Sequence, residues 1–303
     1  IGTIVTTVHG PMVATFRYLD DVIKGGAKMA SPNFFQQTVN NVAGGQLCIQ
    51  NKLKGVSSTL VGCSSIVYAV NLIRQGLADA ILTCGVEELH THIFAGYDRK
   101  HMLATDQGEG EKAVPFSGQA NGAILGEGSA TLVLESYESA KKRKAHIYAE
   151  IVEVAALVDE EFCKNFNELG SDNSSGLYRT MKKVLEKSGI DKEAIDFVSV
   201  AANSSKRVDN GEKKALIKLF GAREEELGYV ASKAIFGETF GASEINAVIC
   251  SLLCMNNGKV PGLLYLHGNT HSIEENELEY ALVNSFFIGG AVNSILLRKV
   301  KED

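Results

Sequence analysis

Residues 56–85 read VSSTLVGCSSIVYAVNLIRQGLADAILTCG, and this stretch predicts one complete strand–helix–strand unit. The apolar residues Ile66, Val67, Val70 and Ile73 follow helical spacing, and Gly76 ends the predicted helix. The flanking runs 56–61 and 78–85 are short and apolar, as expected of buried strands. A strand, a helix and a second strand in this order form a βαβ unit.

The rest of the chain extends this alternation. Further strands are predicted at 1–6, 130–135, 195–201, 228–232, 280–286 and 292–298, and helices at 42–53, 136–144, 174–188, 211–219 and 242–255. The residues between the first strand and Asn33 are expected to form a loop. The pattern favours an α/β fold with largely covered sheets, in two similar halves at residues 1–150 and 151–303.

Composition excludes several classes of protein. The 303 residues are 45% hydrophobic and 22% charged, which is ordinary for a folded protein and unlike a disordered one. A net charge of −6 argues against attraction to nucleic acid or to an anionic membrane. The apolar run 247–255 is far shorter than the roughly 20 residues that cross a bilayer. No secretory leader is visible, and six scattered cysteines indicate reduced thiols in the cytoplasm.

Cys63 is the most suggestive candidate for covalent chemistry. It lies at a predicted strand-to-helix turn, where the partial positive charge of the helix end favours a thiolate. The alternative is a buried structural cysteine, which is the more frequent case. A thiolate nucleophile also needs a base or hydrogen-bonding imidazoles, and no histidine follows a strand of the second half. That absence weakens Cys63 as a catalyst.

Other polar groups carry weaker hypotheses. His90, His92 and His101 with Glu87 and Glu88 have the chemistry of a zinc site, but a strand end and its loop explain them better. The loop 122–128 lacks the Gly-Lys-Ser/Thr ending that a phosphate loop needs. We therefore expect neither a metal nor a cofactor. The basic run 141–144 fits a solvated helix face, or alternatively a docking surface for an acidic carrier protein.

Several motifs, in order and spacing, resemble one known family. They are Ile73 to Asp79 with Cys84 to Glu87, Pro115-Phe116 with Gly126 to Ala130, Glu135 to Lys144 with Ile147 to Glu150, Ser232-Lys233, and Asn284 to Phe286 with Gly289-Gly290. Over residues 41–300 the chain resembles a β-ketoacyl-acyl-carrier-protein synthase, a ketosynthase of the thiolase-like condensing enzymes. The resemblance implies a thiolase-like α-β-α-β-α sandwich of two related halves and an obligate dimer. The opening part of the family's N-terminal half has no counterpart here, so an incomplete first half is expected.

The resemblance also implies that catalytic groups have been lost. In this family a Cys–His–His set accepts the acyl chain and promotes decarboxylation of malonyl-carrier protein. The first histidine position corresponds to Ala201, and the second, in a Lys-x-x-x-Gly-His pattern that begins at Lys233, corresponds to Glu238. Without imidazoles the developing negative charge loses its main partners, and Glu238 would repel a malonyl carboxylate.

The position of the nucleophile stays open from the sequence alone. The segment between Gly55 and Ala69 is a few residues shorter than the family pattern. If the missing residues fall in the helix, Cys63 takes the nucleophile position. If they fall before it, Thr59 takes that position and no thiol is present.

We therefore expect a catalytically degenerate, chain-length-factor-like subunit. Such a subunit would pair with a catalytic ketosynthase, serve an acyl carrier protein in fatty-acid, polyketide or polyene assembly, and shape the acyl tunnel. The tunnel residues would be those of the family's final loop: Phe286, Phe287, Ile288, Gly289 and Gly290. The alternative is an active acyltransferase or thioesterase that uses Cys63 with helpers such as Glu238 or Asn203.

Overall fold

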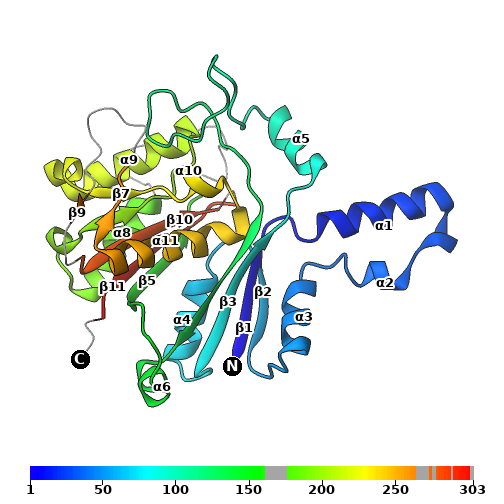
Figure 1. Ribbon diagram of the computed structural model, residues 1–303, viewed down its shortest axis with the longest axis horizontal. Coiled ribbons are helices and arrows are strands. Elements are labelled where there is room, and N and C mark those ends of the chain that lie inside the picture. Colours follow the sequence, from blue (N-terminus) through cyan, green and yellow to red (C-terminus); the bar gives the residue numbers. More distant parts are fainter. Residues whose placement is uncertain (161–175, 264–272, 275–277, 288, 301–303) are drawn as a thin grey trace.

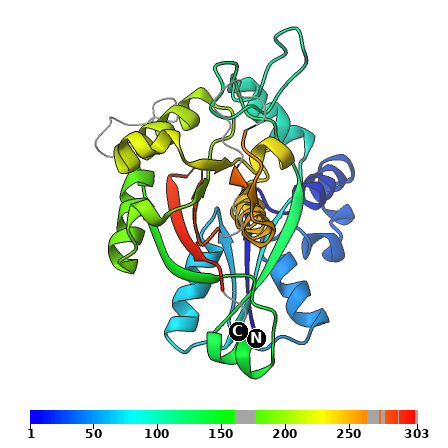
Figure 2. The same cartoon turned by 60° about the vertical axis from the view of Figure 1, so that its left-hand side comes forward.

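Two mixed β-sheets lie face to face, with helices between them and on both outer faces (Figures 1 and 2). The computed structural model describes the chain except for residues 161–175, 264–272, 275–277, 288 and 301–303. The order of layers is α-β-α-β-α, as the family resemblance implies.

The first sheet is built around the predicted βαβ unit. Its strand order is β2-β1-β3-β4, with β1 parallel to β2 and β3, and β4 antiparallel to β3. Every residue of β1 is buried, which explains its continuous apolar and threonine-rich sequence. The strands are β1 (Gly2–Thr7), β2 (Ser57–Val61), β3 (Ala80–Glu87) and β4 (Gly128–Glu135).

The second sheet repeats this topology with one more strand. Its order is β5-β11-β10-β6-β7, and β7, β6, β10 and β11 match β2, β1, β3 and β4 in position and direction. Within the described residues, β4 has no neighbour equivalent to β5 beside β11. The strands are β5 (Glu150–Val158), β6 (Phe197–Ser199), β7 (Gly228–Val230), β10 (Tyr280–Phe286) and β11 (Ala291–Arg298); β8 (Lys259–Val260) and β9 (Ile273–Glu274) form a small separate pair.

Helices α4 (Ser65–Arg74) and α11 (Ser243–Asn257) form the middle layer, and Figure 2 views α11 nearly end-on between the sheets. Both are apolar on more than one side because both sheets cover them. Ile66 of α4 and Ile245 of α11 share one core with Phe197 and Val283 of the second sheet. The functional candidates cluster where these two helices begin.

The outer layers are amphipathic helices. On the second sheet, α8 (Gly176–Ser188) buries the predicted stripe Leu177, Met181 and Leu185, and α9 (Lys206–Phe220) packs beside it. Helix α3 (Val42–Gln50) packs on the first sheet. The other helices are α5 (Thr91–Arg99), α6 (Tyr137–Lys142), α10 (Lys233–Phe236), and the 3-10 turns η1 (Ala27–Met29), η2 (Lys192–Ala194), η3 (Gly221–Glu225) and η4 (Phe240–Ala242). Among the described helices, none is long and apolar enough to cross a membrane.

The prediction of a loop between the first strand and Asn33 is wrong, because this region forms helices. α1 (Met12–Gly25) and α2 (Pro32–Phe35), joined by η1, form an arm that extends away from the body (Figure 1). No residue of α1 is buried, and Ile23 is 77% exposed. The apolar residues recur every three or four positions, which is the helical signal that the prediction missed.

Two glycines allow the halves to approach closely. A Cβ at Gly85 in β3 would lie 2.3 Å from the carbonyl oxygen of Gly241, and one at Gly241 would lie 2.6 Å from the Cα of Thr7. Gly241 belongs to the 3-10 turn just before α11. Any side chain here would separate the start of α11 from the first sheet.

We predict that Gly85→Ala lowers the free energy of unfolding by about 1–3 kcal/mol, the usual cost of overpacking. The matched control is Gly45→Ala, because Gly45 is exposed in α3 and a Cβ there meets no atom within 4 Å. That control is expected to gain up to about 1 kcal/mol from helix propensity. Urea denaturation of both variants measures the difference, and equal stabilities would contradict the close contact.

Candidate functional site

Cys63 lies at the turn between β2 and α4. The turn uses Gly62 with φ +116° and Ser64 with φ +86°, a left-handed conformation that is strained for serine. The Cys63 side chain is buried, and its Sγ accepts a hydrogen bond from Asn293 Nδ2 at 3.2 Å. Thr59 instead lies within β2, opposite Val5 of β1. The thiol, and not the threonine hydroxyl, therefore stands at the N-terminal end of α4.

The final loop of the chain packs over this turn. A Cβ at Gly62 would lie 2.9 Å from the Phe287 ring, so Phe287 covers the turn directly. Gly290, with φ +88°, closes a tight turn in which its N–H donates to the Phe287 carbonyl at 2.8 Å. Gly289 lies beside the same ring. Ile288 lies outside the described residues.

The Ala201 loop is held by a buried carboxylate. The N–H groups of Ala201 and Ala202 donate to Glu212 at 3.0 and 2.7 Å, and Asn284 Nδ2 donates to the same side chain at 2.9 Å. Burial raises the pKa of Glu212 to about 7 against the lowering effect of these hydrogen bonds. Ala201 itself is buried and presents only a methyl group, so this position offers no proton donor.

Lys233 and Glu238 form a buried ion pair. The Nζ of Lys233 lies 2.8 Å from Oε2 of Glu238, and both side chains are under 10% exposed. The Glu238 carboxylate also accepts from Asn203 Nδ2 at 3.1 Å and from Ser243 Oγ at 2.8 Å. The ammonium lies 4.1 Å from the centre of the Phe286 ring, a favourable cation–π distance.

This arrangement fixes Glu238 as a carboxylate. Burial alone would raise the pKa of Glu238, but the Lys233 ammonium and the hydrogen bonds from Ser243 and Asn203 lower it below its ordinary value. A charged, fully coordinated carboxylate has little capacity to donate a proton. Its charge would also oppose any anion that developed beside it.

Another buried carboxylate, Glu244 of α11, lies close to Cys63. It accepts hydrogen bonds from Asn293 Nδ2 at 2.6 Å, from Ser285 Oγ at 3.0 Å and from the N–H of Ser64 at 3.2 Å. Burial, followed by the repulsion of Glu244, raises the pKa of the Cys63 thiol to about 12. At neutral pH the sulfur is therefore a thiol and a weak nucleophile.

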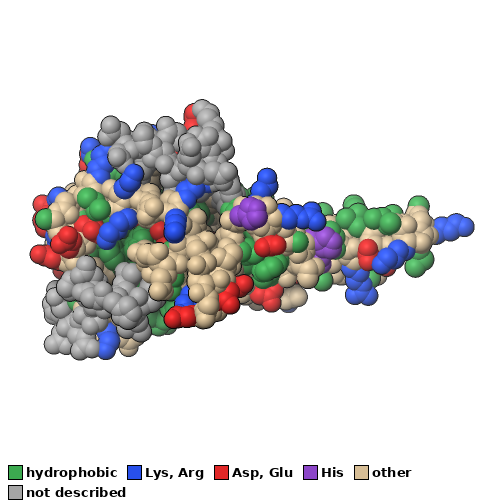
Figure 3. All heavy atoms as spheres, turned by 90° about the horizontal axis from the view of Figure 1, so that it is seen from above, with side chains coloured by type: hydrophobic (Ala, Val, Ile, Leu, Met, Phe, Trp, Pro, Cys, Tyr) green, Lys and Arg blue, Asp and Glu red, His purple; other side chains and the backbone are tan. Residues whose placement is uncertain are grey.

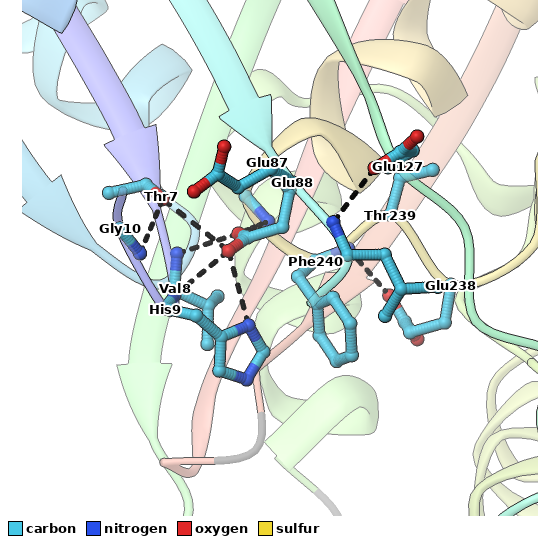
Figure 4. A network of polar contacts seen from close by, with 12 residues as sticks. Thr7, Val8, His9, Gly10, Glu87, Glu88, Glu127, Glu238, Thr239 and Phe240 are labelled. Atoms are coloured by element: carbon cyan, nitrogen blue, oxygen red, sulfur yellow. Dashed lines mark hydrogen bonds and ion pairs between the residues drawn. The ribbon is translucent and has the colours of Figure 1, made fainter. Parts of the chain in front are cut away.

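The buried carboxylate of Glu87 bonds both to the residues that follow β1 and to the turn before α11 (Figure 4). Glu87 at the end of β3 accepts from the N–H groups of Val8 at 2.7 Å, His9 at 2.9 Å and Gly241 at 3.1 Å. Its Oε1 also lies 3.1 Å from Nδ1 of His9, whose ring packs edge-on against Phe240. The Nε2 of His9 contacts the Tyr97 hydroxyl at 3.4 Å.

A cavity of about 270 Å³ opens beside the ion pair. Its walls include Tyr97, Asn203, Glu238, Phe240 and Phe286, and its rim carries Lys100 and Lys206. Cys63 is not among the lining residues. The cavity therefore presents the Glu238 carboxylate and the Asn203 amide together with Tyr97 and His101.

The predicted site residues fall into two neighbouring groups. Cys63 lies with the final loop and β11, whereas Glu238, Asn203 and Phe286 line the cavity. Lys233 contacts Glu238 and Phe286. No described histidine is a hydrogen-bond partner of Cys63, whose contacts are Ser64, Asn293 and the carbonyl of Ala291. His267 and His271 lie outside the described residues.

Sequence reasoning missed Glu244, Asn293 and the contact of Glu87 with His9. The available signal for Glu244 was a charged residue in the first turn of an otherwise apolar helix, because a buried acid needs several donors. The other weak hypotheses gain no support. His90 and His92 stack on Phe16, and the described residues contain no cluster of three metal-binding side chains.

Known proteins share both halves of this architecture. Residues 2–140 match the family model described as the N-terminal domain of β-ketoacyl synthase, and residues 148–267 match the C-terminal domain. The chain belongs to the β-ketoacyl synthase family. The resemblance inferred from sequence motifs and the thiolase-like fold are therefore confirmed.

Individual relatives of this β-ketoacyl synthase family member are distant. A 3-oxoacyl-(acyl-carrier-protein) synthase 2 of Coxiella burnetii is 27% identical, over 99% of this chain and 75% of that relative. A structure of a type II PKS acyl-carrier protein in complex with its ketosynthase bound to the hexaketide matches with a TM-score of 0.90 at 20% identity, covering 99% and 78%. The ishigamide ketosynthase/chain length factor matches with a TM-score of 0.85 at 23% identity, covering 99% and 75%.

We predict that Lys233→Met lowers the free energy of unfolding by about 3–5 kcal/mol, because it leaves the Glu238 charge buried without its partner. Combining Lys233→Met with Glu238→Gln should recover much of the loss.

Because Glu238 has a lowered pKa in the folded state, its stabilising contribution is present above the unfolded pKa of about 4.3 and is lost as the pH falls through the lower folded pKa. Urea titrations at neutral and acidic pH measure both effects, and additive single-variant losses would contradict direct pairing.

Proposed function

We propose that this chain is a catalytically degenerate ketosynthase-like subunit, similar in role to a chain length factor. It pairs with a catalytic ketosynthase, completes the shared interface and shapes the tunnel for an acyl chain carried on an acyl carrier protein. The setting is fatty-acid, polyketide or polyene assembly in the cytoplasm, where the five described cysteines, all free, stay reduced.

The observation that carries this proposal is the Lys233–Glu238 ion pair. It fills the position where, by resemblance, a condensing enzyme has an imidazole that assists loss of the malonyl carboxylate. Glu238 is already bound by Lys233, Asn203 and Ser243, so the site stabilises its own negative charge instead of one that develops on a substrate. Ala201 presents only a methyl group and Glu238 is a paired carboxylate, so neither position that corresponds to a family histidine carries an imidazole.

The state of Cys63 supports the same proposal. A buried thiol with a pKa of about 12 does not accept an acyl group efficiently at neutral pH. Glu238 and Asn203 bond to each other and have no contact with the sulfur, so the alternative of a Cys63 acyltransferase or thioesterase lacks a base.

The α1–α2 arm supplies a surface for the partner. Its exposed apolar residues include Leu19, Ile23, Met29 and Phe35, which are 43%, 77%, 54% and 57% exposed. Figure 3 shows hydrophobic side chains along this arm, interspersed with charged ones. An extended apolar surface of this kind is typical of a protein–protein interface.

Carrier-protein docking fits the rim of the cavity better than the basic run 141–144. That run follows β4 beside Ala80, where β3 begins, whereas Cys63 follows the opposite end of the parallel strand β2. Lys100 and Lys206 are exposed at the cavity, and Figure 3 views this end of the molecule. We place the docking of an acidic carrier protein at this rim.

We predict that the chain co-purifies with a catalytic ketosynthase from the same organism, and that Ile23→Glu, which puts a charge on the arm, abolishes the pairing. Leu77→Glu, at a residue 59% exposed outside the arm, is the matched control and should pair normally. Co-expression with one tagged subunit, followed by size-exclusion chromatography, measures the association.

Intact-mass spectrometry after exposure to acyl-carrier protein completes the test. We expect no acyl adduct on this chain while the partner ketosynthase becomes acylated. An adduct that disappears in Cys63→Ser would establish the acyltransferase alternative. A stable symmetric homodimer without a partner would also overturn the proposal.

A further inference from the structure

The carboxylate of Glu244, close to Cys63, accepts hydrogen bonds from several donors. Asn293 Nδ2, Ser285 Oγ and the N–H of Ser64 all donate to Glu244, and the N–H of Ile66 does the same. The N–H donors cannot accept a hydrogen bond, although the Ser285 hydroxyl can, so a protonated carboxyl would lose some of these bonds. Burial raises the pKa of Glu244, and the hydrogen bonds from Asn293, Ser285, Ile66 and Ser64 oppose that effect by favouring the charged form.

Two of these donors lie at the N-terminal end of α4, the N-cap residue Ser64 and Ile66 in the first turn. The N-terminal N–H groups of a helix carry its partial positive charge and stabilise an anion. A cysteine at this turn would normally use that charge to become a thiolate. In this chain the side chain of Glu244, from a helix 180 residues further along, takes the position of the anion.

Asn293 links the carboxylate to the sulfur. Its Nδ2 lies 2.6 Å from Glu244 Oε1 and 3.2 Å from Cys63 Sγ, and its Oδ1 accepts from Ser64 Oγ at 2.9 Å. The amide nitrogen carries two hydrogens, so it can donate to the carboxylate and to the sulfur at the same time. The other groups that act on the thiol are the hydroxyls of Ser64 and Ser285 and the ammonium of Lys233, all of which favour the thiolate.

We propose that Glu244 is a positioning residue that holds Cys63 as an unreactive thiol, by occupying the N-terminal end of α4 with its carboxylate. This inference deepens the proposed function and rests on it only in taking Cys63 as unacylated. Glu244→Gln keeps the shape of the side chain and removes its charge. The N–H groups at the N-terminal end of α4 can then stabilise a thiolate at Cys63.

Alkylation by iodoacetamide reports directly on the thiolate. The sulfur attacks the methylene carbon, a C–S bond forms as the C–I bond breaks, iodide leaves, and the proton of the thiol goes to solvent. Peptide mass spectrometry follows Cys63, with the half-exposed Cys48 as an internal reference in the same sample. Cys63→Ser assigns the signal.

In Glu244→Gln we expect the pH profile of Cys63 alkylation to move down by about one unit or more, while Cys48 is unchanged. Each unit raises the thiolate fraction tenfold. The lower basicity of the sulfur reduces its intrinsic nucleophilicity about threefold. The net expectation near pH 8 is therefore an increase of about threefold or more in rate.

Glu244→Asp is the matched control, because it keeps the charge and should leave the profile high. Glu244→Ala repeats the test if the amide variant fails to fold, and denaturation curves establish that each variant is folded. Equal profiles in wild type, Gln and Ala variants overturn the inference, as does an Asp variant that reacts like Gln. The proposed function fails separately, through acylation of wild-type Cys63 by carrier protein.

Discussion

The buried pair of Lys233 and Glu238 is the interaction on which the candidate site depends. Two charges removed from water require each other, and removing either one leaves an uncompensated charge inside the protein. The pair also organises its surroundings, since Asn203 bonds to the carboxylate and the Phe286 ring lies against the ammonium. The salt bridge therefore fixes Glu238 in the wall of the cavity. The two opposite charges largely neutralise each other.

Three buried glutamates repeat this theme at the junction of the two halves. Glu87 of the first half accepts from Gly241 of the second, and Glu244 of the second half accepts from Ser64 of the first. Glu238 accepts from Asn203 within the second half. Each carboxylate is satisfied by several donors, as a buried charge requires. Hydrogen-bond donors of both halves therefore serve the protein's own carboxylates.

Local sequence patterns predicted those helices and strands whose apolar residues follow a regular spacing. The helical spacing of Ile66, Val67 and Val70 and the stripe of α8 identified elements whose burial the structure confirms. The α1 arm was missed because none of its residues is buried, so no core segment accompanied the helical pattern. The roles of Ala201 and Glu238 came from the family resemblance, since an alanine and a glutamate carry no such signal by themselves. The effect of Glu244 on Cys63 depends on a contact across 180 residues, which no local spacing encodes.

The most direct measurement of the central claim is decarboxylation of malonyl-carrier protein by the isolated chain, followed by conversion to acetyl-carrier protein in mass spectra. The account predicts no conversion above the rate without protein, because the negative charge that develops would face Glu238 and the Ala201 methyl group in place of imidazoles. Conversion that is faster with this chain than without it, and that is lost in Glu238→Gln or Cys63→Ser, would contradict the account.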